Sequence, residues 1–126
     1  MIEKSGAMEI LVASCPSFQS KWASHLAEWG NDVLYSAAGD FASHLLDVYR
    51  ANGETSFPKI AVAIERLMTE GVPWVREFAA VGVLEGVQNC WLNHGEDPEI
   101  FGAHLLPKGR QSWEALNAFW LGSEKK

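Results

Sequence analysis

The sequence predicts an all-α fold, a small bundle or solenoid of antiparallel helix hairpins with about six to seven helices. Apolar residues recur at helical spacing in most segments, and clusters of Gly, Pro, Asn and Asp separate these segments. No run of alternating apolar and polar residues indicates a strand. We expect residues 1–126 to form a single all-helical domain, with frayed ends over residues 1–6 and 123–126.

The first half of the chain predicts three helices. A short helix over residues 7–14 is followed by one that starts near Pro16 and ends at Gly30. In that second helix an apolar stripe is expected to face the core; it consists of Phe18, Trp22, Leu26 and Trp29. A third helix is expected from residue 33 to about residue 51, because Asn52-Gly53 is a typical helix end.

The stretch Phe57–Asn93 predicts two helices folded back on each other across Gly71-Val72-Pro73. Between Phe78 and Val87 the second helix carries one charge, Glu85, so we expect it to be buried on nearly all sides. Counting outward from the turn places Gly82 opposite Ala61 and Val62, which predicts a close crossing there. The same count places Glu85 opposite Lys59, which predicts a structural ion pair.

Two further helices are predicted after this pair. Asp97-Pro98 is typical of a helix start and predicts a short helix to about Leu105. Pro107 and Gly109 separate it from a last helix that ends at Gly122. One apolar face of this last helix is formed by Trp113, Leu116, Phe119 and Trp120.

Part of the central pair resembles a HEAT-type helical repeat. The segment from Val75-Arg76 to Glu85 is similar to the second helix of such a repeat, which commonly opens with Val-Arg followed by small residues. The resemblance covers residues 57–93 and implies that Arg76 serves packing. The Asp usual in the turn of the family is replaced here by Val72-Pro73-Trp74.

Three histidines occupy equivalent positions in a repeated pattern of aromatic, two small residues, His and Leu. They are His25, His44 and His104, and we expect each at the border of a buried stripe. A three-histidine metal site is the alternative. In a tight hairpin, however, His25 and His44 lie about 10 Å apart along the axis, which is too far for one ion. We therefore predict no catalytic residue, no cofactor and no metal.

The charge balance favours basic partners. The chain carries 16 acidic and 10 basic side chains and has a net charge of −6, which disfavours nucleic acids and anionic membranes. Cys15 and Cys90 form no metal or redox motif, and the short apolar run near the start is neither a signal peptide nor a membrane span. We expect a reduced, cytoplasmic protein.

Two acidic surfaces and two tryptophans are the predicted partner-binding residues. The third helix carries Asp40, His44 and Asp47 on its predicted outer face. The loop after the central pair carries Glu96 and Asp97, which form a second acidic patch together with Glu99. The unusual number of tryptophans, six, favours partly exposed rings as binding anchors. The two best placed for this role are Trp74 and Trp91.

The chain as a whole is similar to short bacterial immunity proteins of uncharacterised families. The similarity rests on its size, on Cys15-Pro16-Ser17-Phe18 and on the spacing of Trp113, Leu116, Phe119 and Trp120 near the other end. It implies stoichiometric binding that occludes a basic toxin or effector domain. A small helical enzyme, metal-dependent or based on His and Glu, and an adaptor subunit of a larger assembly are the alternatives.

Overall fold

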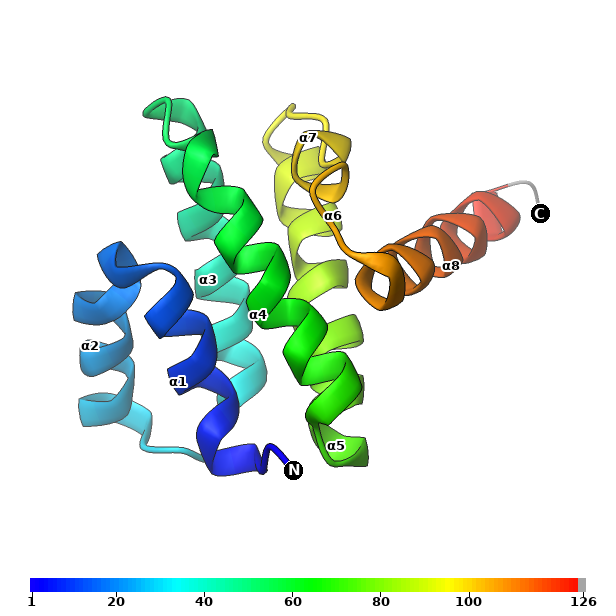
Figure 1. Ribbon diagram of the computed structural model, residues 1–126. Helices are drawn as coiled ribbons and strands as arrows, with labels where there is room; N and C mark the ends of the chain where they lie inside the picture. The colour runs from blue at the N-terminus through cyan, green and yellow to red at the C-terminus, as the bar shows by residue number, and fades with distance from the viewer. Residues whose placement is uncertain (125–126) are drawn as a thin grey trace.

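The computed structural model describes the backbone of residues 1–124 and the side chains of residues 1–119, and it confirms the all-α fold (Figure 1). No strand forms within residues 1–124, in which an isolated β-bridge pairs Ile2 with Gly71. The described backbone contains seven α-helical segments when the continuous run Pro73–Asn93 is counted once. They are α1 (Lys4–Ser14), α2 (Gln19–Trp29), α3 (Leu34–Arg50), α4 (Phe57–Glu70), the run α5 (Pro73–Glu77) to α6 (Glu85–Asn93), α7 (Glu99–Gly102) and α8 (Pro107–Glu124).

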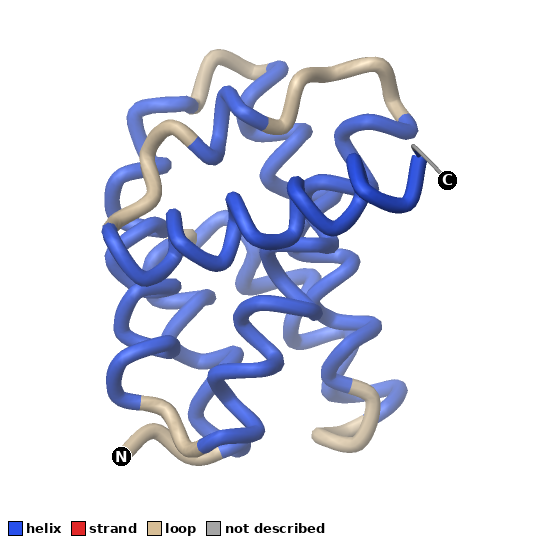
Figure 2. Tube along the Cα trace, turned by 90° about the vertical axis from the view of Figure 1, so that its right-hand side faces the viewer, coloured by secondary structure: helices blue, strands red, loops and turns tan. Residues whose placement is uncertain are grey.

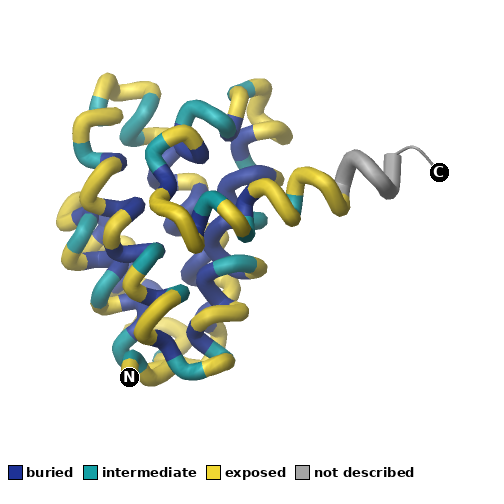
Figure 3. Tube along the Cα trace, turned by 45° about the vertical axis from the view of Figure 1, so that its right-hand side comes forward, coloured by how far each residue is buried: buried dark blue, intermediate teal, exposed yellow. Residues whose placement is uncertain are grey.

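Helices α1, α3 and α4 and the run from α5 to α6 lie side by side, with α2 at one edge and α8 lying across the opposite side (Figures 1 and 2). Helix α3 packs along α6, while α4 contacts both α1 and α8. Large aromatic side chains fill the space between these helices, and Figure 3 shows the buried positions gathered there. No helix in the described part of the chain is both long enough and apolar enough to cross a lipid bilayer.

The buried second helix of the central pair is confirmed, but its crossing partner is a different helix from the one predicted. Between α5 and α6 the chain forms a π-helical segment, η3 (Phe78–Leu84). Gly82 in η3 and Gly86 in α6 lie against Ala38 and Ala42 of α3, whereas the prediction placed Gly82 opposite α4. A wider π turn changes which residues point in a given direction, so counting outward from the turn with a regular helical period fails here.

Both ends of the described backbone extend beyond the helices predicted there. Helix α1 begins at Lys4, three residues earlier than predicted, and Ile2 takes part in two backbone hydrogen bonds. The amide of Ile2 donates to the carbonyl of Glu70 at 2.8 Å, and the amide of Val72 donates to the carbonyl of Ile2 at 3.0 Å. At the other end α8 continues through Gly122 to Glu124; residues 125 and 126, and the side chain of Trp120, lie outside the described residues.

Helix α8 is fixed to the rest of the fold at its first turns. The carboxylate of Glu65 on α4 accepts hydrogen bonds from the backbone amides of Lys108 (3.0 Å) and Gly109 (2.8 Å). It therefore satisfies two of the amides that the start of a helix leaves without partners, and its negative charge suits that helix end. Beyond these turns α8 extends away from the helical body (Figure 3).

Candidate functional site

A cavity of about 440 Å³ lies between α2 and α3. Helix α2 borders this cavity because it packs only loosely, burying just Trp22 and His25 among its eleven residues. The predicted α2 stripe is therefore partly wrong, since Leu26 and Trp29 are 37% and 52% exposed. Eight residues line the cavity: Ser20, Lys21, Ser24, His25, Glu28, Trp29, Asp40 and Ser43.

Two unpaired carboxylates and an exposed indole share this cavity. Glu28 and Asp40 are exposed and make no ion pair with any side chain that the structure describes. Trp29 lines the same cavity from the end of α2. With Asp47 about two turns further along α3, these residues form what we call the acidic α2–α3 surface: Glu28, Trp29, Asp40 and Asp47.

Beside this surface a chain of polar contacts runs from Ser17 to Asp47. The ammonium of Lys21 lies 3.2 Å from Nδ1 of His44 and 3.7 Å from a carboxylate oxygen of Asp47. Nε2 of the same imidazole lies 2.8 Å from the hydroxyl of Ser17. His44 was predicted on the outer face of its helix, but its side chain is buried and packs against Phe18, because η1 (Pro16–Phe18) covers it.

The Ser17–His44 pair is arranged as a structural contact and not as a nucleophile with its base. A lysine ammonium has only donors, so Nδ1 of His44 accepts from Lys21 and the ring proton lies on Nε2. Nε2 then donates to the Ser17 hydroxyl and cannot remove a proton from it. Burial, with the charge of Lys21 acting in the same direction and Asp47 opposing it, lowers the pKa of His44 and keeps the ring neutral.

His25 is the other buried polar group at the cavity. Its side chain is 6% exposed, stacks on Trp22 and is among the residues that line the cavity. Its Nε2 is buried and has no hydrogen-bond partner among the described residues. A buried imidazole nitrogen with unmet hydrogen-bonding capacity is unusual in a folded protein and therefore informative about the site.

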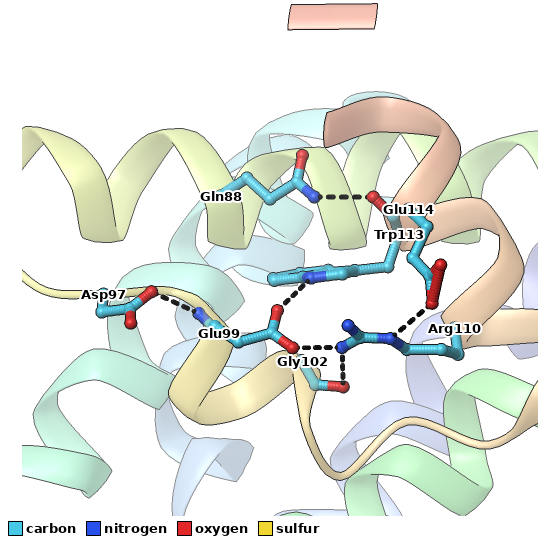
Figure 4. A network of polar contacts seen from close by, with 7 residues as sticks. All are labelled: Gln88, Asp97, Glu99, Gly102, Arg110, Trp113 and Glu114. Atoms are coloured by element: carbon cyan, nitrogen blue, oxygen red, sulfur yellow. Dashed lines mark hydrogen bonds and ion pairs between the residues drawn. The ribbon is translucent and has the colours of Figure 1, made fainter. Parts of the chain in front are cut away.

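The second predicted acidic surface is largely used within the fold, as Figure 4 shows for Glu99. The carboxylate of Glu99 accepts hydrogen bonds from Arg110 and from the indole Nε1 of Trp113 at 2.9 Å. Asp97 accepts from the backbone amide of Glu99 at 2.9 Å and so starts α7, which is shorter than predicted. Glu96 forms an ion pair with Arg50 at 3.4 Å. Glu99 thus joins α7 to α8, Asp97 binds the first backbone amide of α7, and Glu96 joins the loop after α6 to the end of α3.

The two predicted tryptophan anchors lie in different places, neither on the acidic α2–α3 surface. Trp91 was expected to be partly exposed, but it is fully buried, and its indole Nε1 donates to the carbonyl of Ala42 at 3.2 Å. Trp74 is half-buried, stacks on Phe78 and lies under the ammonium of Lys4, 4.9 Å from the ring centroid. Trp74 thus remains a partly accessible ring, away from Asp40 and Asp47.

The three repeated histidines have three separate environments. His104 lies at the fold's outer edge, 3.2 Å from a carboxylate oxygen of Glu54, while His25 and His44 have the contacts given above. Within the described residues, no group of three or more His, Cys, Asp or Glu side chains is close enough to hold a metal ion. The predicted Glu85–Lys59 pair is wrong: no ion pair between described residues joins these side chains.

Sequence reasoning identified Asp40 and Asp47 but missed Glu28 and Trp29 as members of the same surface. The signal was present, because Glu28-Trp29 ends one predicted helix and Asp40 lies in the next helix, which is predicted to run antiparallel to it. Trp29 was instead counted with the core stripe. Periodicity alone does not reveal that α2 has too few neighbours to cover both of its sides.

A family model described as Domain of unknown function (DUF7674) matches residues 8–121 of the chain, a span that includes every residue of the acidic α2–α3 surface. No curated protein and no solved structure matches the chain.

Proposed function

The chain belongs to the DUF7674 family, and we propose that its function is stoichiometric binding of a basic protein partner through the acidic α2–α3 surface. The observation that carries the proposal is the cavity in which Glu28 and Asp40 stand unpaired beside the half-exposed ring of Trp29. Carboxylates at an interface steer a basic partner during association, whereas a desolvated aromatic ring slows its dissociation. Both kinds of group are exposed on this surface, so they are free to contact a partner.

The partner we propose is a toxin or effector domain whose active site this chain occludes, as an immunity protein does. The similarity to short immunity proteins and the net charge of −6 both support this. An enzyme is less well supported, because the neutral His44 donates to Ser17 and provides no general base. An adaptor subunit would bind its partner without inhibiting it, and this difference separates the two binding functions.

Capture from the native cytoplasm on the immobilised chain tests the proposal. We expect a basic protein retained at a one-to-one ratio and lost when the surface is neutralised in Glu28→Gln/Asp40→Asn/Asp47→Asn. A matched variant, Glu9→Gln/Glu70→Gln/Glu77→Gln, changes the net charge equally at exposed positions elsewhere and should retain it. Equal loss from both variants, or a partner that is acidic, would refute binding through this surface.

A second measurement addresses occlusion. The captured partner should lose its own activity when one equivalent of the chain is added, and recover it with the neutralised variant. A partner that stays fully active in the saturated complex would point to the adaptor function and contradict immunity. A reading frame for a secreted toxin directly upstream of the gene would agree with inhibition of the partner and therefore with an immunity function.

A further inference from the structure

We infer that the cavity between α2 and α3 receives one arginine side chain of the bound partner. This rests on the proposed function and specifies how the acidic α2–α3 surface recognises a basic protein. Two of the side chains that line the cavity, Glu28 and Asp40, are carboxylates, and the one basic side chain that lines it, Lys21, is already paired with Asp47 outside the cavity. The cavity therefore carries uncompensated negative charge that a cationic side chain of a partner would offset.

Lys21, which lines the cavity, does not pair with Glu28 or Asp40. The ammonium of Lys21 is directed to Nδ1 of His44 at 3.2 Å and to Asp47 at 3.7 Å. These contacts turn it toward the His44 side of α3 and leave Glu28 and Asp40 without a cationic partner among the described residues. A cation that pairs with these two carboxylates has to come from outside the chain.

The other groups around the cavity favour a guanidinium over an ammonium. A guanidinium is planar and always charged, it stacks on aromatic faces, and its five N–H donors need several acceptors. The indole of Trp29 supplies the face, and the hydroxyls of Ser20, Ser24 and Ser43 supply acceptors in addition to the carboxylates. His25 is also among the lining residues, is more than nine-tenths buried, and has an Nε2 without a hydrogen-bond partner among the described residues, so the hydrogen bonding at this edge of the cavity is incomplete within the chain itself.

The test uses Nα-acetyl-arginine methylamide as the probe and its citrulline analogue, which has nearly the same shape without the charge. Binding to the full chain is followed by NMR through the Trp29 indole N–H and the His25 ring signals. We expect saturable shifts with the arginine probe and at least about tenfold weaker binding of the citrulline probe, since an ionised donor roughly doubles the strength of a hydrogen bond. Trp29→Ala should weaken the arginine probe about two- to fivefold through loss of the cation–π contact.

Glu28→Gln/Asp40→Asn should abolish the preference for arginine over citrulline, while Glu9→Gln/Glu77→Gln, with the same change in net charge, should keep it. Equal binding of the two probes, an absence of shifts with either, or equal effects of the two double variants would overturn the inference. Each of these results leaves the proposed function open to its own capture test, because a basic partner can bind the acidic α2–α3 surface without inserting an arginine. Retention of a partner that is lost with the triple neutralised variant, together with a failed probe titration, would reject the arginine site alone.

Discussion

The crossing of α3 with the run from η3 to α6 makes a sharp prediction, because three glycines inside helices differ in the space around them. A Cβ atom added at Gly82 would lie 3.2 Å from Cδ1 of Phe78 and 3.3 Å from Cδ1 of Tyr35. One added at Gly86 would meet its nearest neighbour, Cβ of Ala42, at 3.6 Å, and one added at Gly39 would meet nothing within 4 Å. The same substitution should therefore have three different effects.

Alanine in place of glycine inside a helix gains about 0.5–1 kcal/mol from backbone entropy. Gly39→Ala should show the full stabilisation, and Gly86→Ala most of it. In Gly82→Ala the cost of displacing the rings of Phe78 and Tyr35 should cancel the stabilisation. Leucine enlarges the contrast: Gly82→Leu should cost about 1–3 kcal/mol by overpacking, while Gly39→Leu should be neutral or stabilising. Urea unfolding with an unchanged m-value measures each free energy. Equal stability of Gly82→Leu and Gly39→Leu would refute the close crossing.

Three further predictions concern single side chains. Glu65→Ala should lower the unfolding free energy by about 1–2 kcal/mol and speed hydrogen exchange at the first amides of α8, and unchanged exchange there would contradict its capping role. Glu99→Gln should cost about 1–2 kcal/mol in urea unfolding by weakening the charged bond to Arg110, and Arg110→Gln in that background should then cost less than it does alone. Because the folded-state pKa of His44 is lowered, the unfolded chain binds more protons, so stability is fully present above the ordinary histidine pKa of about 6.5 and falls as the pH drops below it. Urea unfolding across this range should show a smaller pH dependence in His44→Gln, and an equal dependence would contradict the assignment.

The fold class and most of the helices could be predicted from the sequence because they depend on local patterns. The stripe of α4 and the low charge of the segment after Phe78 predict burial directly, and both helices are present. The end of α3 at Arg50 is equally local, because Asn52 shortly after it has a positive φ of 65°, a conformation that asparagine tolerates better than most residues.

The side-chain assignments that failed all depend on contacts between segments distant in the sequence. In the sequence Glu99 looks like an ordinary surface charge. In the structure its carboxylate accepts hydrogen bonds from Arg110 and Trp113, both of which lie on the next helix. Trp91 lies near the end of a helix, where exposure is common, but Tyr49, Phe57 and Phe101 surround its ring. Such neighbours come from the packing of whole helices, which periodicity within one helix does not specify.

The acidic α2–α3 surface was half predictable for the same reason. Asp40 and Asp47 lie on the polar side of an amphipathic helix, which the sequence shows. The cavity itself depends on how α2 packs against α3, which buries only two α2 side chains and which periodicity within one helix does not specify. His25 is one of the two buried side chains of α2, and no local pattern predicts that its Nε2 has no hydrogen-bond partner among the described residues.

The salt dependence of the association rate tests the central claim most directly. Stopped-flow mixing of the chain with its captured partner, from low to high ionic strength, should give a rate that falls steeply with salt. Asp40→Lys/Asp47→Lys should slow association at low salt and flatten this dependence, while Glu9→Lys/Glu77→Lys, with the same change in net charge, should do so far less. Equal effects of the two variants, or a wild-type rate that does not change with salt, would contradict recognition of a basic partner by the acidic α2–α3 surface.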